Sequence, residues 1–139
     1  MITSKVKLNE EIIFEKTFGT KEVEYFAEVS EDNNPIHLDS EYAAKSIFKK
    51  KVVHGILLAS MFSKIFGTIY PGNGGIYLSQ SIKFLKPAFV GEKITAKAEL
   101  LSFDNIKKQG IFKTECYNEK DELIVTGEAK ILFPKEFEL

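Results

Sequence analysis

Cysteine is nearly absent from this sequence, and so is any surplus of charge of one sign. Cys116 is the only cysteine among 139 residues, so no disulfide can form within the chain. Its alternating surroundings favour a small buried side chain over a nucleophile. The 19 Lys and Arg residues are balanced by 20 Asp and Glu residues, a net charge of −1, whereas duplex nucleic acid demands a broad cationic face. The short run Lys49–Lys51 is either a solvated loop or a contact for the phosphates of a nucleotide-bearing ligand.

A long uninterrupted apolar run is also missing. The N-terminus lacks the apolar core of a signal peptide, and polar residues such as His54 and Lys64 interrupt the most apolar stretch, 52–69. We therefore expect a cytoplasmic protein that neither spans nor binds a membrane. With 44% hydrophobic and 28% charged residues, the chain resembles ordinary globular proteins. This composition predicts one domain, residues 1–139, with a core that needs no disulfide or metal.

The first half of the sequence has mostly helical patterns. It predicts a strand over 11–18, a helix capped by Thr20 that runs to about Ser30, and a short helix capped by Ser40 that includes Ala43 and Ala44. The segment 31–35 between these helices should be irregular, because Asn and Asp favour turns and Pro35 disfavours a helical conformation in the residue before it.

The second half predicts one buried helix followed by a sheet. Residues 55–69 are apolar almost all round, so this helix, roughly 22 Å long, should be surrounded by protein. Strand patterns follow at 76–85, 93–103, 109–117 and 123–133, with short turns between them. The second of these strands alternates apolar and polar residues, as expected for one buried face. An antiparallel sheet wrapped around a central helix, the α+β hot-dog fold, satisfies these burial requirements, although other α+β packings also do.

Two histidines and one aspartate could carry chemistry. His37 closes the segment that begins with Asp32, and His54 directly precedes Gly55 at the start of the buried helix. Singly, an Asp in a turn or a partly buried His has a structural explanation. Together they provide a base and a proton donor beside a helix start with unpaired N–H groups. A thioester carbonyl bound there would have its developing enolate oxygen stabilised by the Gly55 N–H.

These residues also form a specific motif. The pattern Asp32-x-Asn34-Pro35-Ile36-His37-x-Asp39, followed by Val52-Val53-His54-Gly55 and by Phe84-Leu85-Lys86-Pro87-Ala88-Phe89-x-Gly91-Glu92, resembles the MaoC-like dehydratases, and within them the (R)-specific enoyl-CoA hydratases. The resemblance covers roughly residues 22–133. It implies reversible hydration of a trans-2-enoyl-CoA by a hot-dog homodimer, without a metal or a redox cofactor.

The resemblance also implies roles for individual residues. It assigns catalysis to Asp32 and His37, the oxyanion hole to Gly55, and substrate binding to Asn34, Ser63 and His54. One position departs from the family pattern, because Glu31 stands where a glycine is usual. We expect the preceding helix to continue through Glu31; if the position instead needs a positive φ, the strain is of order 1 kcal/mol.

Other functions remain compatible with the sequence. The same residue pair serves a 3-hydroxyacyl-acyl-carrier-protein dehydratase, and Lys49–Lys51 could meet either an acidic carrier protein or the CoA phosphates. A third reading is a hot-dog thioesterase or a non-catalytic binder of acyl thioesters. Thioesterases of this fold usually carry a carboxylate on or near the central helix, and residues 55–69 contain no Asp or Glu. The bulk of Phe66 favours short acyl chains. We expect the dimer contact near Ile76, Leu78, Ile82 and Phe84.

Overall fold

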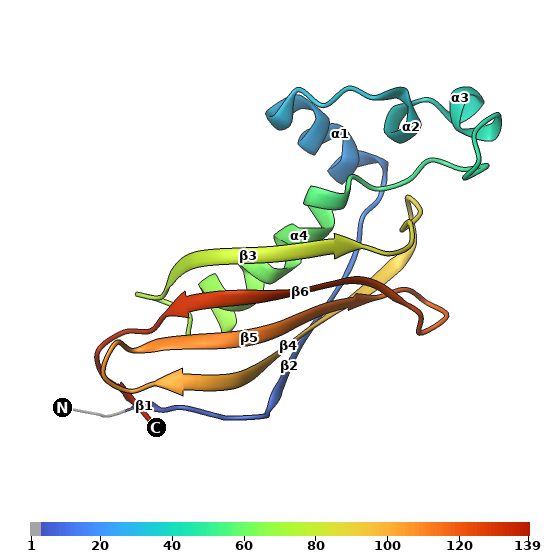
Figure 1. The fold of residues 1–139 in the computed structure, drawn as a ribbon. Coiled ribbons are helices and arrows are strands. Elements are labelled where there is room, and N and C mark those ends of the chain that lie inside the picture. The colour runs from blue at the N-terminus through green and yellow to red at the C-terminus, as the bar shows by residue number, and fades with distance from the viewer. Residues whose placement is uncertain (1–3) are drawn as a thin grey trace.

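The computed structural model describes residues 4–139 and has a sheet packed against one long helix (Figure 1). The helical elements are α1 (Thr20–Ser30), α2 (Pro35–Leu38), α3 (Ser40–Ala44), α4 (Gly55–Lys64) and the π-helix η1 (Ile65–Ile69). The strands are β1 (Ser4–Lys5), β2 (Glu11–Thr17), β3 (Ile76–Phe84), β4 (Lys93–Asp104), β5 (Gln109–Tyr117), β6 (Leu123–Leu132) and β7 (Phe137–Glu138). The main sheet has the order β2-β4-β5-β6-β3, with every neighbouring pair antiparallel. This confirms the predicted α+β arrangement.

The face of the sheet that α4 covers is apolar. Along β4, Ile94, Ala96, Ala98 and Leu100 are fully buried, as the alternation of residue types predicts. The two alanines lack bulk, so α4 approaches β4 closely and its Phe62 joins the same core. Cys116 also lies in this core, and burial raises the pKa of its thiol to about 12, in keeping with the predicted structural role.

The central helix differs from its prediction in two ways. It begins at Gly55 as expected, but it changes to a π-helix at Ile65 instead of continuing as an α-helix. It is also covered on one side only, so Ile56 is 60% exposed and Ile69 is 44% exposed. The expectation of a helix surrounded by protein is therefore wrong for a single chain, because the sheet does not close around α4.

The structure corrects the predicted helix caps. Gly19, and not Thr20, is the N-cap of α1; its N–H donates to the Glu22 carboxylate at 2.9 Å. At α3 the cap is Asp39, and not Ser40, because the Asp39 carboxylate accepts from two backbone N–H groups of the first turn. Each cap lies one residue before the predicted one. At α3 the Asp39 carboxylate accepts two N–H groups at once, and at α1 the Glu22 carboxylate bonds back to the Gly19 N–H.

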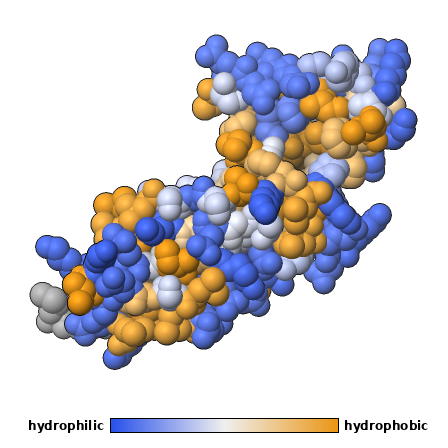
Figure 2. Space-filling model, in the orientation of Figure 1, coloured by the Kyte–Doolittle hydropathy of each residue, from blue (hydrophilic) through white to orange (hydrophobic). Residues whose placement is uncertain are grey.

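Beyond the sheet, α1, α2 and α3 project as a separate group above one end of β3 (Figure 1). Figure 2 shows apolar surface where this group meets α4 and the adjoining end of β3. No helix among residues 4–139 is both long and apolar enough to cross a membrane. The strands β1 and β7, two residues each, form a small parallel pair that the sequence did not predict, because two residues show no alternation.

Two glycines provide a matched test of packing. A Cβ at position 127 would lie 1.9 Å from the Ser81 carbonyl oxygen, whereas a Cβ at position 67 would meet nothing within 4 Å. We expect Gly127→Ala to lower the free energy of unfolding by 1–3 kcal/mol or more, roughly the cost of overpacking. Gly67→Ala should be neutral or stabilising by about 0.5–1 kcal/mol, since alanine loses less entropy in a helix. Urea unfolding measures both, and equal effects would contradict this account.

Candidate active site

A chain of hydrogen bonds between neighbouring residues fixes the loop that carries Asp32. The Asp32 N–H donates to Ser30 Oγ at 3.1 Å, and its carboxylate accepts from the Asn34 N–H at 3.2 Å. Asn34 then caps α2 by accepting from the Ile36 N–H at 3.1 Å, and Pro35 occupies the first position of that helix. Asn34 thus holds the loop. Its expected contact with substrate stays a prediction.

Glu31 adopts the conformation that a glycine would favour. Its φ is 62°, in the left-handed region, and α1 ends at Ser30. The expected continuation of the helix through Glu31 is therefore wrong. A non-glycine residue in this region costs roughly 1–2 kcal/mol. The reversal that Glu31 makes directs the following residue, Asp32, back toward the start of α4.

His37 is oriented by a backbone carbonyl. Its Nδ1 lies 2.7 Å from the carbonyl oxygen of Val52, so the ring donates from Nδ1. In the neutral ring this leaves the lone pair of Nε2 free to accept a proton or a hydrogen bond. The Val52 carbonyl was not identified from the sequence, because no pattern of side chains marks it.

His54 lies beneath His37. The two rings stack with centroids 3.7 Å apart, and Phe26 packs edge-on against the His54 ring at 4.7 Å. His54 is 2% exposed, and its Nε2 donates to the carbonyl oxygen of Asp32 at 3.2 Å. Burial lowers the pKa of His54, although its bond to that carbonyl acts in the opposite direction. The ring is too deeply buried for the expected direct contact with substrate, and it supports Asp32 and His37 instead.

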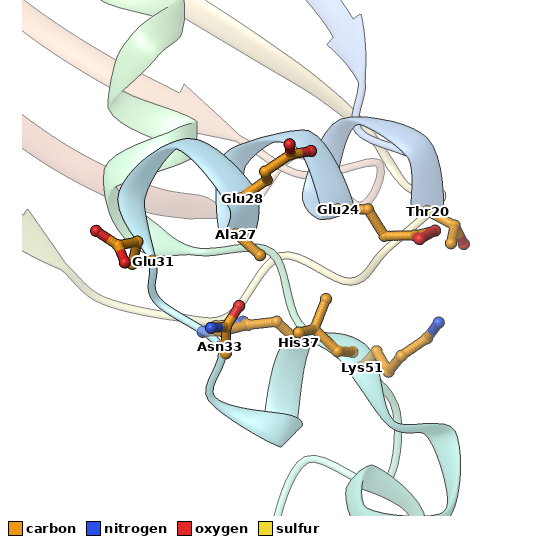
Figure 3. Close-up of a pocket in the computed structure, with 9 residues that line it drawn as sticks. Thr20, Glu24, Ala27, Glu28, Glu31, Asn33, His37 and Lys51 are labelled. Carbon is orange, nitrogen blue, oxygen red and sulfur yellow. The ribbon is translucent and has the colours of Figure 1, made fainter.

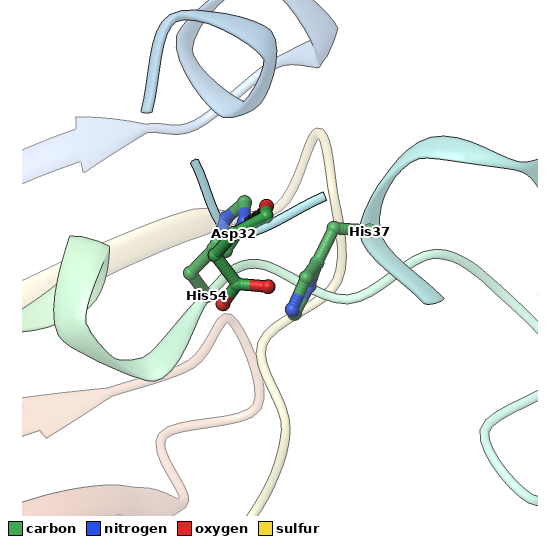
Figure 4. Close-up of side chains that lie close together, drawn as sticks. All are labelled: Asp32, His37 and His54. Atoms are coloured by element: carbon green, nitrogen blue, oxygen red, sulfur yellow. Dashed lines mark hydrogen bonds between the residues drawn. The ribbon is translucent and has the colours of Figure 1, made fainter. Parts of the chain in front are cut away.

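These contacts bring three side chains to one point. A carboxylate oxygen of Asp32 and ring nitrogens of His37 and His54 all lie within 4.8 Å of one another, and Figure 4 shows the Asp32 carboxylate directed toward the His37 ring. Asp32 is exposed and His37 is half-buried. A single water or hydroxyl group could bind to both at once, as expected from the sequence.

Gly55 lies beside this point at the start of α4. His54 is the N-cap and offers no side-chain cap, so the positive end of the helix is open. A Cβ at position 55 would lie 2.7 Å from the ring of Phe84, so a residue larger than glycine would require this half-exposed ring or the helix start to shift. Gly55 and His37 both line an apolar cavity of about 490 Å³, together with Leu58, Phe84 and Ala88. An apolar acyl group with one polar end fits such a cavity.

A second cavity, of about 630 Å³, lies beside the first and shares His37 with it (Figure 3). It is polar, and its remaining lining residues include Thr20, Glu24, Glu28, Glu31, Asn33 and Lys51. Sequence reasoning did not connect α1 with the site. The four-residue spacing of Glu24 and Glu28 on one helical face was the available signal.

Ser63 does not reach this site within one chain. It lies two turns beyond Gly55, about 12 Å along the helix at 1.5 Å per residue. There it lines a separate cavity of about 100 Å³ with Phe66 and Tyr77. The structure thus brings Asp32, His37 and Gly55 together but leaves Ser63 apart.

The sheet, the central helix and the residue pair at its start define a hot-dog protein with an acid–base site. The chain belongs to the MaoC-like family, because the family model described as a MaoC-like domain matches residues 3–124.

Named relatives are similar over most of their length. The (R)-specific enoyl-CoA hydratase of Aeromonas caviae is 40% identical over 134 residues, 96% of this chain and 100% of the relative. A mitochondrial 3-hydroxyacyl-acyl-carrier-protein dehydratase of Arabidopsis thaliana is 36% identical over 122 residues, 86% of this chain and 72% of the relative. The solved (R)-hydratase of A. caviae involved in PHA biosynthesis has a TM-score of 0.91 at 41% identity, over 93% of this chain and 98% of that one. The unliganded (R)-hydratase of Pseudomonas aeruginosa has a TM-score of 0.89 at 32% identity, over 94% and 83%.

The buried His54 should make stability depend on pH. Because burial lowers its pKa below the ordinary 6.5, the unfolded chain takes up a proton at a higher pH than the folded chain. Its contribution to stability is therefore present above about pH 6.5 and is lost as the pH falls toward the lower folded pKa. Urea unfolding at several pH values should show this slope in the wild type and a smaller slope in His54→Gln. Identical slopes would contradict it.

The three clustered side chains should not bind a metal. The His37 and His54 rings are inclined by 25° and lie 3.7 Å apart, so their nitrogen lone pairs lie in nearly parallel planes and do not converge on one point. Zinc needs its imidazole lone pairs directed at one centre about 2.0–2.1 Å from each nitrogen. We expect neither a chelator nor added zinc to change the midpoint of thermal unfolding. A zinc-dependent rise that His37→Gln abolishes would show that the site does bind metal.

Proposed function

We propose that this chain is an (R)-specific enoyl-CoA hydratase, a hydro-lyase that reversibly adds water to trans-2-enoyl-CoA. The observation that carries the proposal is the convergence of Asp32 and His37 beside the open start of α4. The names of the similar hydratases and dehydratases agree with this chemistry. His37 and Gly55 line one apolar cavity, and the Asp32 carboxylate lies within 4.8 Å of a His37 ring nitrogen.

The geometry suits a syn addition from a single water. The water donates one hydrogen bond to the Asp32 carboxylate and the other to the free Nε2 of His37. Asp32 accepts a proton as the water oxygen bonds to C3, and the electron pair of the C2–C3 double bond moves toward the thioester oxygen. The protonated Asp32 returns this proton to C2 as the electron pair moves back from the thioester oxygen, so the hydroxyl group ends on C3 and the proton on C2.

The thioester oxygen carries negative charge in the enolate-like transition state. The Gly55 N–H and the positive end of α4 would stabilise this charge. A larger residue at position 55 would contact the ring of Phe84, so either this ring or the helix start would have to shift. Gly55 thus contributes an N–H group and the space in front of it.

The carrier and the acyl chain complete the proposal. CoA is the carrier of the A. caviae hydratase by its name, and an acyl carrier protein is that of the A. thaliana dehydratase, so both remain candidates. A thioesterase is disfavoured, because α4 and η1 contain no carboxylate. Phe66 is buried and lines the separate 100 Å³ cavity, and not the apolar cavity beside Gly55, so a preference for short acyl chains such as crotonyl stays a prediction.

We also propose that the enzyme is a cytoplasmic homodimer. The strand β3 is an edge of the sheet, and Ile76, Leu78 and Phe84 on it are 43–53% exposed. An exposed apolar edge strand favours pairing with a second chain. Ile82, also expected at the contact, packs against the core of its own chain instead. A partner would cover the open side of α4 and exclude water from the exposed Asp32.

The catalytic pair is tested by substitution. Asp32→Asn and His37→Gln should each lower kcat with crotonyl-CoA by about 10²–10⁴, the usual contribution of an acid–base group. The double variant should be little slower than the slower single variant, because both groups act on one water. Loss of the enoyl-thioester absorbance measures the rate, and circular dichroism checks that each variant folds. More than about a tenth of wild-type turnover in Asp32→Asn would remove Asp32 from the mechanism, and multiplying losses would exclude a shared water.

The dimer is tested by two leucines of equal exposure. Leu78 on β3 is 43% exposed and Leu101 on β4 is 44% exposed, and each lies at a break in strand register. Sedimentation of the wild type should show a species near 31 kDa, twice the 15.7 kDa chain. Leu78→Glu should dissociate it and lower activity per chain, because a carboxylate would be buried without a partner. Leu101→Glu should leave the dimer intact. A fully active monomer would overturn the proposal.

A further inference from the structure

Three cavities follow one another away from the start of α4. The apolar cavity contains Gly55 and His37, and the polar cavity shares His37 with it. A third cavity, of about 290 Å³, shares Thr20 and Lys51 with the polar one. The shared residues place the three cavities next to one another, so together they form a path that begins beside Gly55, where the thioester would lie.

The far end of this path is cationic. The third cavity is lined by Lys49, Lys50 and Lys51, by the hydroxyl-bearing Thr20 and Ser40, and by Val90, so none of its lining residues carries a carboxylate. The ion pairs found among residues 4–139 involve other lysines. Three ammonium groups and two hydroxyls form a donor set suited to phosphate oxygens.

The backbone at Lys49 explains how neighbouring lysines line one cavity. In an extended chain, successive side chains point to opposite sides. Lys49 has a φ of 66°, in the left-handed region, which turns the chain between Ser46 and Lys50. Lys50 also lies over the ring of Phe89 at 4.9 Å, which restricts its stem. The lysine cluster is therefore partly held in place before any ligand binds.

The middle of the path is less suited to an anion than its far end, because three glutamates face one lysine, Lys51, there. Glu24, Glu28 and Glu31 line the polar cavity and repel phosphate, but their oxygens can accept hydrogen bonds from neutral amide and hydroxyl groups. A ligand with a neutral, hydrogen-bonding arm and a phosphate at the far end of that arm matches the order of these cavities. The other cation near the thioester end, Lys86, is already paired with Glu122 at 2.6 Å.

We propose that Lys49, Lys50 and Lys51, with the hydroxyls of Thr20 and Ser40, bind a phosphate group of the thiol carrier at the far end of its pantetheine arm. This proposal rests on the hydratase function, because that function places the thioester at Gly55. The same phosphate chemistry belongs to CoA and to the phosphopantetheine of a carrier protein. The lysine site thus selects for a phosphorylated carrier.

The test compares substrates that share the crotonyl-pantetheine group and differ in the phosphate or nucleotide attached to its far end. Crotonyl-CoA, crotonyl-phosphopantetheine and crotonyl-pantetheine are hydrated by the wild type and by the triple variant Lys49→Gln, Lys50→Gln, Lys51→Gln. The ratio of the KM for crotonyl-CoA to the KM for crotonyl-pantetheine should rise roughly 10–100-fold in the triple variant, the loss expected for hydrogen bonds to a charged group. A ratio that stays at its wild-type value would overturn the proposal.

A second variant controls for net charge. Lys107→Gln, Lys130→Gln and Lys135→Gln together remove the same charge from exposed lysines on or beside the β4–β5 turn and the end of β6. This end of the sheet lies away from α1, α2 and α3 (Figure 1). This control variant should keep the wild-type ratio of the two KM values. An equal rise of the ratio in both variants would mean that net charge causes the effect, and it would contradict a local phosphate site. If the rise also occurs with crotonyl-phosphopantetheine, the lysines bind the phosphate next to the arm. If it occurs with crotonyl-CoA alone, they bind the nucleotide phosphates.

Failure of the hydratase function gives a different result. If the wild type hydrates none of the three substrates, the proposed reaction is wrong, and the lysine site is then tested by calorimetric titration with CoA. Binding weakened at least about tenfold by the Lys49–Lys51 variant, and not by the control variant, supports the site. Equal affinities in all three proteins would overturn it independently of any turnover.

Discussion

The site depends on one buried residue, His54. Its hydrogen bond to the Asp32 carbonyl joins two segments that are 22 positions apart in the chain, and its ring supports His37 from below. Phe26 of α1 packs against the same ring, so the end of α1, the Asp32 loop and the start of α4 all meet at His54. The relative positions of the base, the imidazole and the helix start therefore follow from the packing of this one side chain.

His54 can hold this position because it is neutral. Burial disfavours the imidazolium, and an imidazolium at the N-terminus of α4 would also face the positive end of the helix dipole. The same dipole favours the negative charge that develops on a thioester oxygen at Gly55. The N-terminus of α4 thus disfavours a positive charge on His54 and would stabilise the negative charge of the enolate. The buried Nδ1 of His54 has no partner among the described residues, which is the cost of this arrangement.

The sequence predicted the parts of the fold that rest on regular patterns. The alternation along β4 and the apolar residues after Gly55 predicted the sheet and its helix, because burial imposes those periods. The Asp32–His37 motif predicted the pair because local bonds around Asn34 fix its geometry. The caps of α1 and α3, the π-helix and the left-handed turn at Glu31 were missed or predicted wrongly, since each is decided by a competition between neighbouring residues. The cavities were missed because α1 and the Lys49–Lys51 turn meet only in the folded chain.

A single chain leaves its chemistry incomplete, and the reason lies in packing. The sheet covers one side of α4, so Ile56 on the other side stays exposed, and so does Asp32 at the mouth of the site. Charge stabilisation by an N–H group is much stronger when water is excluded. The open side of α4 and the edge strand β3 both leave apolar side chains exposed in one chain, so an additional surface that reached both could shield them. A second chain placed there would enclose the thioester end of the cavities and leave the lysine end open to solvent. Dimer formation would then affect the reaction centre, whereas the carrier would be recognised at the other end of the path.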